Sequence, residues 1–147
     1  MGDDRAVDSV VVTQTVRLLS PFVFTYGLYT MFHGASSVGG GFQGGVVVAS
    51  VVVTLAFAFG IDQTGDWLDR GLLTGAAVLG VLSFALVGLG PLAFDGVSFE
   101  FTAYPGEKGA LYAVEAVEVA IGVTVAATVT ILFFELSGGF DERGGSE

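Results

Sequence analysis

Hydrophobic residues along this chain gather in four long runs that are separated by short polar stretches. The runs cover about residues 13–32, 44–59, 72–94 and 111–136. A helix needs about 20 residues to cross the ~30 Å hydrocarbon layer of a bilayer, where every backbone polar group must be bonded internally. The pattern therefore predicts an all-α fold, an integral membrane bundle of four transmembrane helices that forms a single domain over residues 1–147.

The connections between the runs indicate how the chain is oriented in the membrane. The second connection, IDQTGDWLDRG, is expected in water, with Trp67 at the membrane interface. Lys and Arg favour the cytoplasmic side, whereas acidic residues contribute little to orientation. Both termini are therefore predicted to be cytoplasmic in a multi-pass protein of the cell membrane, because the four arginines fall on one side and the single lysine on the other: Arg5, Arg17, Arg70 and Arg143 against Lys108.

Composition supports a membrane protein and excludes several kinds of site. Of the 147 residues, 52% are hydrophobic and only 14% are charged, against about 25% charged in soluble domains. There is no Cys and one His, which excludes disulfides, Cys-ligated zinc, iron–sulfur clusters and multi-histidine metal sites. The net charge of −10 makes nucleic acid a poor partner and suggests a salt-rich surrounding solution. The acidic start, MGDDRAVDS, has no cleavage pattern, so the first run is expected to remain in the mature protein.

The stretch SSVGGGFQGGVVVAS, at residues 36–50, has two interpretations. Gly39, Gly41 and Gly44 satisfy the G-x-G-x-x-G pattern of dinucleotide-binding folds, but that pattern requires a preceding strand and a soluble βαβ unit. Helix-length apolar runs flank it here, and no Lys follows as in a P-loop. The alternative is a tight hinge between the first two membrane helices, with pairs four residues apart that allow close helix packing. We expect this packing hinge to comprise Gly39, Gly40, Gly41, Phe42, Gln43, Gly44 and Gly45, together with Pro21 of the first run.

Residues 15–45 resemble a known family of membrane proteins. The run TVRLLSPFVFTYGLYTMFHGASSVGGGFQGG is similar to the first helix and glycine signature of the B-type subunit of Mrp-type multisubunit sodium/proton antiporters. EVAIGVTVAA, at residues 118–127, resembles the last helix of that family more loosely. The matching positions are Arg17, Pro21, Phe22, Gly27, Leu28, Tyr29, His33, Gly34 and residues 39–45.

The resemblance implies a membrane subunit of a hetero-oligomeric antiporter that exchanges Na⁺ for protons. Its partners would be other membrane subunits and the lipid bilayer, and it would act without a cofactor of its own. Related small subunits occur in membrane-bound hydrogenases, so a membrane-arm subunit of an ion-translocating redox complex is the alternative. A channel formed by several copies of this chain is a third hypothesis. Enzymatic catalysis has little support, because no activated Ser, Cys or His constellation is present.

Two polar positions and a proline in the first run need explanation. A charged side chain at the centre of a membrane helix costs about 2.5–3.5 kcal/mol on insertion scales. Arg17 is expected a few ångströms inside the cytoplasmic boundary, where its side chain can extend to water. Pro21 lacks an N–H, which leaves the carbonyl of Arg17 free for an ion or a partner and should kink the helix. His33 either relays protons near neutral pH or is a bonded histidine at the interface.

Glu115 and Glu118 are the acidic candidates for an ion path. They are three residues apart, so they share one face of the last helix. If Glu135 marks the opposite boundary, Glu118 lies ~25 Å from it and Glu115 ~30 Å, at 1.5 Å per residue. Glu115 can then reach water, and Glu118 lies just below the surface. A polar collar, or a structural bond to a neighbouring subunit, is the alternative for both and is favoured for Glu115. The candidates for the ion path are thus Glu118, Glu115, His33 and Arg17.

Overall fold

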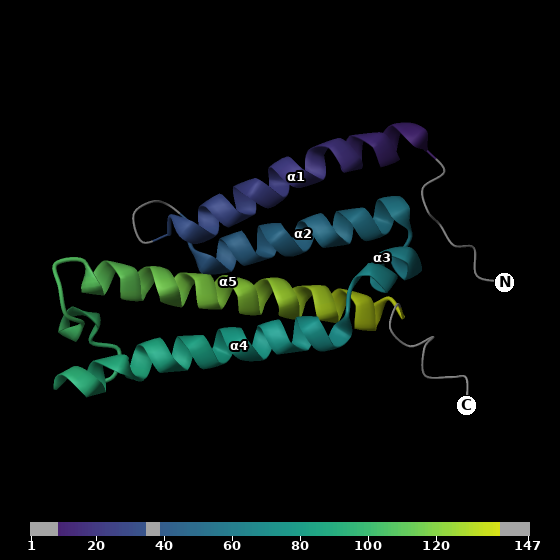
Figure 1. The fold of residues 1–147 in the computed structure, drawn as a ribbon. Coiled ribbons are helices and arrows are strands. Elements are labelled where there is room, and N and C mark those ends of the chain that lie inside the picture. The colour runs from purple at the N-terminus through teal and green to yellow at the C-terminus, as the bar shows by residue number, and fades with distance from the viewer. Residues whose placement is uncertain (1–8, 35–38, 139–147) are drawn as a thin grey trace, which may run out of the picture.

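The computed structural model describes residues 9–34 and 39–138. In this part of the chain all regular structure is helical, which confirms the all-α prediction. The elements are α1 (Val10–Phe32), α2 (Gly41–Phe59), α3 (Ile61–Trp67), α4 (Arg70–Leu89) and α5 (Gly109–Leu136), with short 3₁₀ turns η1 (Gly90–Phe94) and η2 (Phe101–Ala103) between the last two helices (Figure 1).

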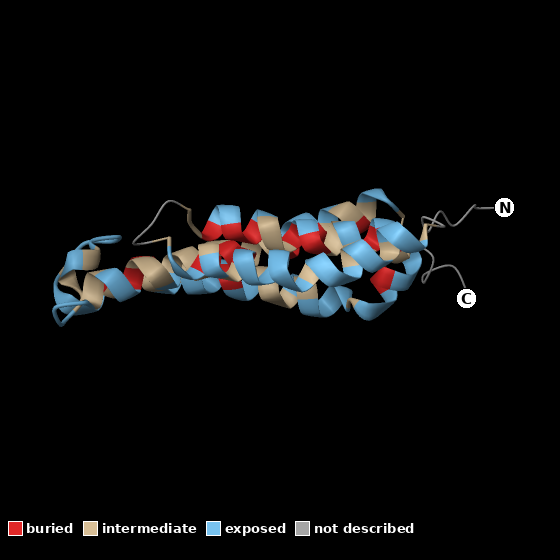
Figure 2. Ribbon diagram, turned by 90° about the horizontal axis from the view of Figure 1, so that it is seen from above, coloured by how far each residue is buried: buried red, intermediate tan, exposed pale blue. Residues whose placement is uncertain are grey.

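The four long helices lie antiparallel in a row, in the order α1, α2, α5, α4 (Figure 1). α5 therefore packs against α2 on one side and α4 on the other, while α1 and α4 form the two edges. Buried residues lie along the seams between helices, and much of the outer surface is exposed (Figure 2). The row consequently has two broad faces that no part of the described chain covers.

The row has two distinct ends. α1 begins, α2 ends, α4 begins and α5 ends at one of them, which we call the terminal end (Figure 1). α1 ends and α2 begins at the other, together with the 3₁₀ turns, and we call it the hinge end. Arg70 of α4 forms an ion pair with Glu135 of α5 at the terminal end.

Three helical segments in the described residues are long and apolar enough to cross a membrane: Gly41–Phe59, Arg70–Phe94 and Gly109–Leu136. The chain is thus a multi-pass membrane protein. α1, with 23 residues, has the length but not the hydropathy, because it carries Gln14, Arg17, Pro21 and several Thr and Tyr residues. The prediction of four spans is therefore matched by four long helices, of which three are apolar enough.

The ends of the helices follow from caps and prolines. The Asp69 carboxylate accepts a hydrogen bond from the Leu72 amide at 2.9 Å and caps α4. The third apolar run reaches residue 94, but α4 ends at Leu89 because Pro91 has no N–H to bond the Val87 carbonyl. The Tyr104 hydroxyl donates to that carbonyl instead, at 2.7 Å. Pro21 leaves α1 uninterrupted, and the Thr25 hydroxyl donates to the Pro21 carbonyl at 2.7 Å.

Small residues allow the helices to pack closely along the seam between α4 and α5. A Cβ added at Gly80 would lie 2.8 Å from the Ala120 carbonyl oxygen and would overlap the Thr124 hydroxyl. That hydroxyl donates to the same carbonyl at 2.9 Å, so it is satisfied within α5. Close contact here depends on the missing side chain of Gly80, as expected for small-residue packing in membranes.

Candidate functional site

The glycines at the start of α2 bring that helix against α5 at Glu118. A Cβ added at Gly41 would overlap the backbone carbonyl of Glu118, and one added at Gly45 would lie 2.5 Å from the Gly122 carbonyl oxygen. Both pairs are four residues apart, so one ridge of α2 lies along one ridge of α5. No side chain fits at Gly41 or Gly45 without moving a backbone.

Gly44 points to the opposite neighbour, α1. A Cβ at Gly44 would lie 2.7 Å from the Gly27 carbonyl oxygen and 2.8 Å from the Met31 amide nitrogen. Met31 is buried and also reaches α5, because a Cβ at Gly122 would lie 2.6 Å from its sulfur. α1, α2 and α5 therefore meet at a single junction formed by glycines and Met31.

The backbone just before α2 has a conformation that favours glycine. Gly39 and Gly40 have φ angles of 149° and 146°, which side-chain-bearing residues rarely adopt. A Cβ at Gly39 would also lie 2.8 Å from the Thr30 methyl carbon. These two residues turn the chain into α2, whereas Gly41, Phe42, Gln43, Gly44 and Gly45 belong to its first turns.

The carboxylate of Glu118 lies at this junction, against the end of α1 and the start of α2. A Cβ at Gly34 would overlap the carboxylate, and one at Gly40 would lie 3.6 Å from its Oε1 atom. The residue is half-buried. The N-terminal end of α2 carries partial positive charge, which favours an anion beside it. Glycine backbone surrounds this carboxylate, and a carboxylate in such a position can accept a proton or bind a cation.

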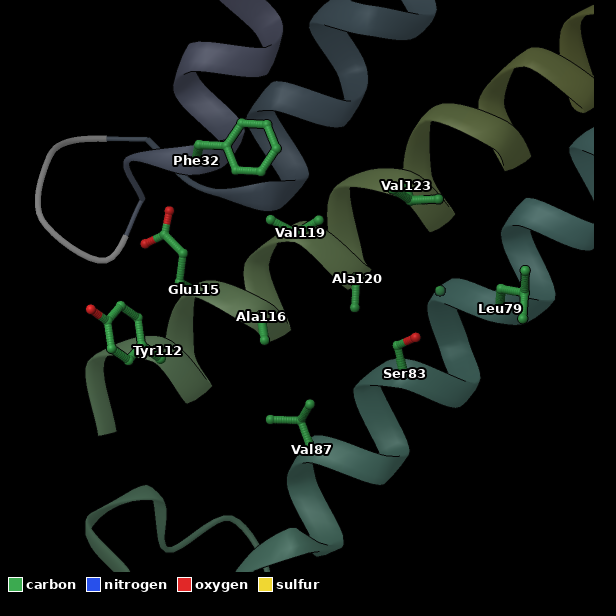
Figure 3. A pocket seen from close by; sticks show the side chains of 11 residues that line it. Phe32, Leu79, Ser83, Val87, Tyr112, Glu115, Ala116, Val119, Ala120 and Val123 are labelled. Carbon is green, nitrogen blue, oxygen red and sulfur yellow. The ribbon is translucent and has the colours of Figure 1, made fainter. Parts of the chain in front are cut away.

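Glu115 lies one turn before Glu118 and opens into a groove of about 550 Å³ between α4 and α5 (Figure 3). Its side chain points toward Phe32 at the end of α1, near the rim of the groove. The groove is otherwise largely apolar. Its lining comprises Phe32, Leu79, Gly80, Ser83, Val87, Tyr112, Glu115, Ala116, Val119, Ala120 and Val123.

The structure separates the other candidates from one another. His33 is exposed at the hinge end, where its ring stacks on Tyr29 with centroids 4.3 Å apart and its Nδ1 lies 3.2 Å from the Tyr29 carbonyl oxygen. Arg17 lies at the terminal end, with its guanidinium 5.8 Å from the centroid of the Phe59 ring. Arg17 is thus far along the row from Glu118, and Pro21 lies between the two ends. Phe42 and Gln43 point outward and are exposed.

Sequence reasoning missed Gly34, Gly122 and Met31 as parts of the junction. Gly34 matches the family pattern, but nothing in the sequence shows that it faces Glu118. Gly122 does carry a signal, because it follows Glu118 by four residues, the same spacing as Gly41 and Gly45. In the described residues no group of three His, Cys, Asp or Glu side chains is placed to hold a metal ion.

Comparison with known proteins identifies the family. Residues 11–133 match the family described as a domain related to the MnhB subunit of Na⁺/H⁺ antiporters. The chain belongs to this family. The predicted resemblance to the B-type subunit of such antiporters is therefore confirmed. Because the MnhB description names the antiporter, the antiporter interpretation has support that the hydrogenase alternative lacks.

Individual relatives agree with this assignment. A Staphylococcus haemolyticus protein named "Putative antiporter subunit mnhB2" is 29% identical over 137 residues, which are 88% of this chain and 95% of that protein. A protein of the same name from Staphylococcus aureus (strain Newman) is 31% identical over 87 residues, 57% of this chain and 60% of that protein. An uncharacterized protein of Methanocaldococcus jannaschii is 28% identical over 128 residues, 81% of this chain. This chain spans about half the length of the M. jannaschii protein, with 48% covered.

Proposed function

We propose that this MnhB-family chain is a membrane subunit of a multisubunit Na⁺/H⁺ antiporter and that Glu118 lines an ion path in the complex. The observation that carries the second part is the position of the Glu118 carboxylate within the glycine junction of α1, α2 and α5. The family match and the names of the relatives support the first part. The chain is then a transporter component rather than an enzyme, and it acts without a cofactor.

The location of Glu118 suits a group that binds and releases ions. It lies seventeen residues, or ~25 Å at 1.5 Å per residue, from Glu135 at the terminal end. If Glu135 marks the membrane boundary, Glu118 would lie just inside the hydrocarbon at the hinge end, where carboxylates facing a protein interior are functional candidates. His33 lies at the same end and would connect Glu118 to water. Arg17, at the opposite end, would contribute only at the other mouth of such a path.

The partners of the chain would be the other membrane subunits of the antiporter and the surrounding lipid, with Na⁺ and H⁺ as the transported ions. Nucleic acid has no place in this function, given the net charge of −10. With both termini in the cytoplasm, the hinge end faces the outside of the cell. The junction around Glu118 would then receive or release ions on the external side.

Replacement of Glu118 tests this role. Glu118→Gln keeps the size and hydrogen-bonding capacity of the side chain but removes its charge, so we expect reduced cation-driven pH change in vesicles that contain the whole complex. Loss of a general acid or base typically reduces a rate by ~10²-fold or more. Glu118→Asp should retain part of the exchange, because it keeps a titrating group.

Glu115→Gln is the comparison variant, and exchange is normalised to the amount of assembled complex. We expect a smaller loss per complex for Glu115→Gln, because Glu118 and not Glu115 lies within the glycine junction. Full exchange in Glu118→Gln would make the residue structural and reduce the role of this chain to that of a scaffold. A loss that only follows reduced assembly would lead to the same conclusion.

A further inference from the structure

The groove between α4 and α5 is long enough to accommodate part of another helix. Its lining extends from Tyr112 to Val123 on α5 and from Leu79 to Val87 on α4. At 1.5 Å per residue these stretches measure ~16 Å and ~12 Å, which is two to three turns of an α-helix. The groove lies over the seam between the two helices, and its lining residues come from α4, α5 and the end of α1 (Figure 3).

The floor of the groove is formed by small residues. Gly80 and Ser83 line it from α4, and Ala116 and Ala120 line it from α5. Residues of this size are typical of helix–helix contacts in membranes, where dispersion and interhelical hydrogen bonds replace the hydrophobic effect as the driving force. Small residues alone do not identify the occupant of the groove. The charge in the groove gives the further information.

Glu115 supplies that charge. Its carboxylate makes no hydrogen bond and no ion pair with any other residue in the part of the chain that the structure describes. The described residues that line the groove include no Lys, Arg or His, and Phe32 and Val119 add apolar surface to the same lining. A half-buried carboxylate at the edge of the hydrocarbon is stabilised by a cation or a strong hydrogen-bond donor opposite it. The groove is therefore complementary to an apolar helix with one basic side chain at the hinge end.

Three occupants can be compared on these grounds. A second copy of the chain would insert in the same orientation, so a two-fold contact would place groove against groove and Glu115 near Glu115, with no cation at that depth. A lipid acyl chain could fill the apolar part but provides no partner for Glu115 unless an amine headgroup sits above it. A helix of another subunit can contact the apolar lining, pack on the small residues of the floor and provide a basic partner for the Glu115 carboxylate.

We propose that the α4–α5 groove binds a transmembrane helix of another subunit of the complex, and that a Lys or Arg of that helix pairs with Glu115. This proposal rests on the proposed function in one respect: it requires that the chain belongs to a hetero-oligomeric complex. It assigns Glu115 and Glu118 different tasks, because Glu115 holds a partner and Glu118 serves the ion path. The two residues can therefore be tested separately.

Photo-crosslinking in the intact complex identifies the occupant. A benzophenone amino acid is placed at position 79, where Leu79 lines the groove, and in a matched protein at position 81, where Val81 is exposed on the other side of α4. We expect the probe at 79 to join one particular other subunit, and the probe at 81 not to give that product. Attachment at position 79 only to lipid, or only to a second copy of this chain, would overturn the proposal.

Charge reversal tests the pairing. Glu115→Lys should reduce the amount of the crosslinked subunit that co-purifies with this chain by about tenfold or more, because like charges then face each other. Glu115→Gln should reduce it less, and Glu107→Gln, which removes an exposed carboxylate from the loop before α5, should leave it unchanged. Unchanged assembly of Glu115→Lys would refute the ion pair. Glu118→Gln should leave assembly intact, so failure of the ion path and failure of this interface give different results.

Discussion

At the scale of single residues, the proposed role of Glu118 rests on the absence of side chains around it as much as on its charge. Among the described residues, Glu118 is the one acidic residue that the glycine junction encloses, and Gly34, Gly40 and Gly41 lie beside it. A side chain at Gly34 or Gly41 would displace either the carboxylate or the α5 backbone. The same residues that let the helices touch therefore also determine where the carboxylate lies.

Gly41→Ala tests the close contact between α2 and α5. The added Cβ would overlap the Glu118 carbonyl, so we expect destabilisation by about 1–3 kcal/mol, as for other over-packed sites. The measurement is the thermal stability and yield of the purified complex. Gly75→Ala is the matched control, because it is also a helical glycine but its Cβ would have no atom within 4 Å. If the two variants are equally stable, the close approach at Gly41 is not required.

At the scale of helices, the order of the row brings the start of α4 beside the end of α5. α5 is one of the two inner helices, with Glu115 and Glu118 in its first three turns and Glu135 in its last turn. Arg70 begins α4, and Glu135 is the second-last residue of α5. Each charge opposes the dipole of its own helix but faces the favourable end of the neighbouring antiparallel helix. The ion pair therefore joins the start of α4 to the end of α5 at the terminal end.

A double-mutant cycle with Arg70→Gln and Glu135→Gln measures that pair. Because both side chains are partly exposed, we expect a coupling free energy of only about 0.2–1 kcal/mol, with a double variant less destabilised than the sum of the single ones. Thermal unfolding of the purified complex at low and high salt gives the values. Additive effects at low salt would contradict a specific interaction, and a coupling that persists unchanged at high salt would contradict its ionic origin.

The sequence predicts where the long helices lie, but not which of them contact each other. The four apolar runs identify the long helices because a bilayer permits few alternatives for backbone bonding. Hydropathy does not say which helices touch, so the order of the row is visible only in the structure. The sequence predicts a polar connection where α3 lies, since seven residues such as IDQTGDW are too few to show a period. The third apolar run extends five residues beyond the end of α4, because Pro91 and its substitute donor Tyr104 are distant in sequence.

The candidate site was predictable in part. The spacing of Gly41 and Gly45 indicates close helix contact, but not that α5 is the neighbour, nor that Gly44 faces α1 instead. Glu118 is a candidate because carboxylates inside membranes are rare, whereas its position under the hinge requires the fold. The difference between Glu115 and Glu118 is expected from depth alone. The groove beside Glu115 could not be predicted, because it arises from the packing of α4 on α5.

At the scale of the whole molecule, a flat row of helices is suited to assembly with other subunits in a larger complex. A closed bundle would bury its own polar groups, whereas this row leaves both broad faces and both edges available for contact (Figure 2). α1, the least apolar long helix, lies at one edge, with Arg17 and Tyr26 exposed. Such a helix is better covered by protein than by lipid, which agrees with the proposed role within an antiporter complex.

The row also makes the orientation in the membrane testable. Arg17 and Arg70 lie toward the terminal end and Lys108 lies at the hinge end, while Arg5 and Arg143 fall outside the described residues. Positive residues favour the cytoplasm, so the terminal end should be cytoplasmic. The chain has no Cys, so single cysteines can be introduced at Gln63 on α3 and at Glu107 before α5, both exposed. In intact cells, a membrane-impermeant thiol reagent should label Glu107→Cys at once, and Gln63→Cys only after permeabilisation. If Gln63→Cys is labelled in intact cells and Glu107→Cys only after permeabilisation, the orientation is the reverse of the predicted one and the fold is unaffected. Labelling of both positions from outside would contradict the antiparallel row in the membrane.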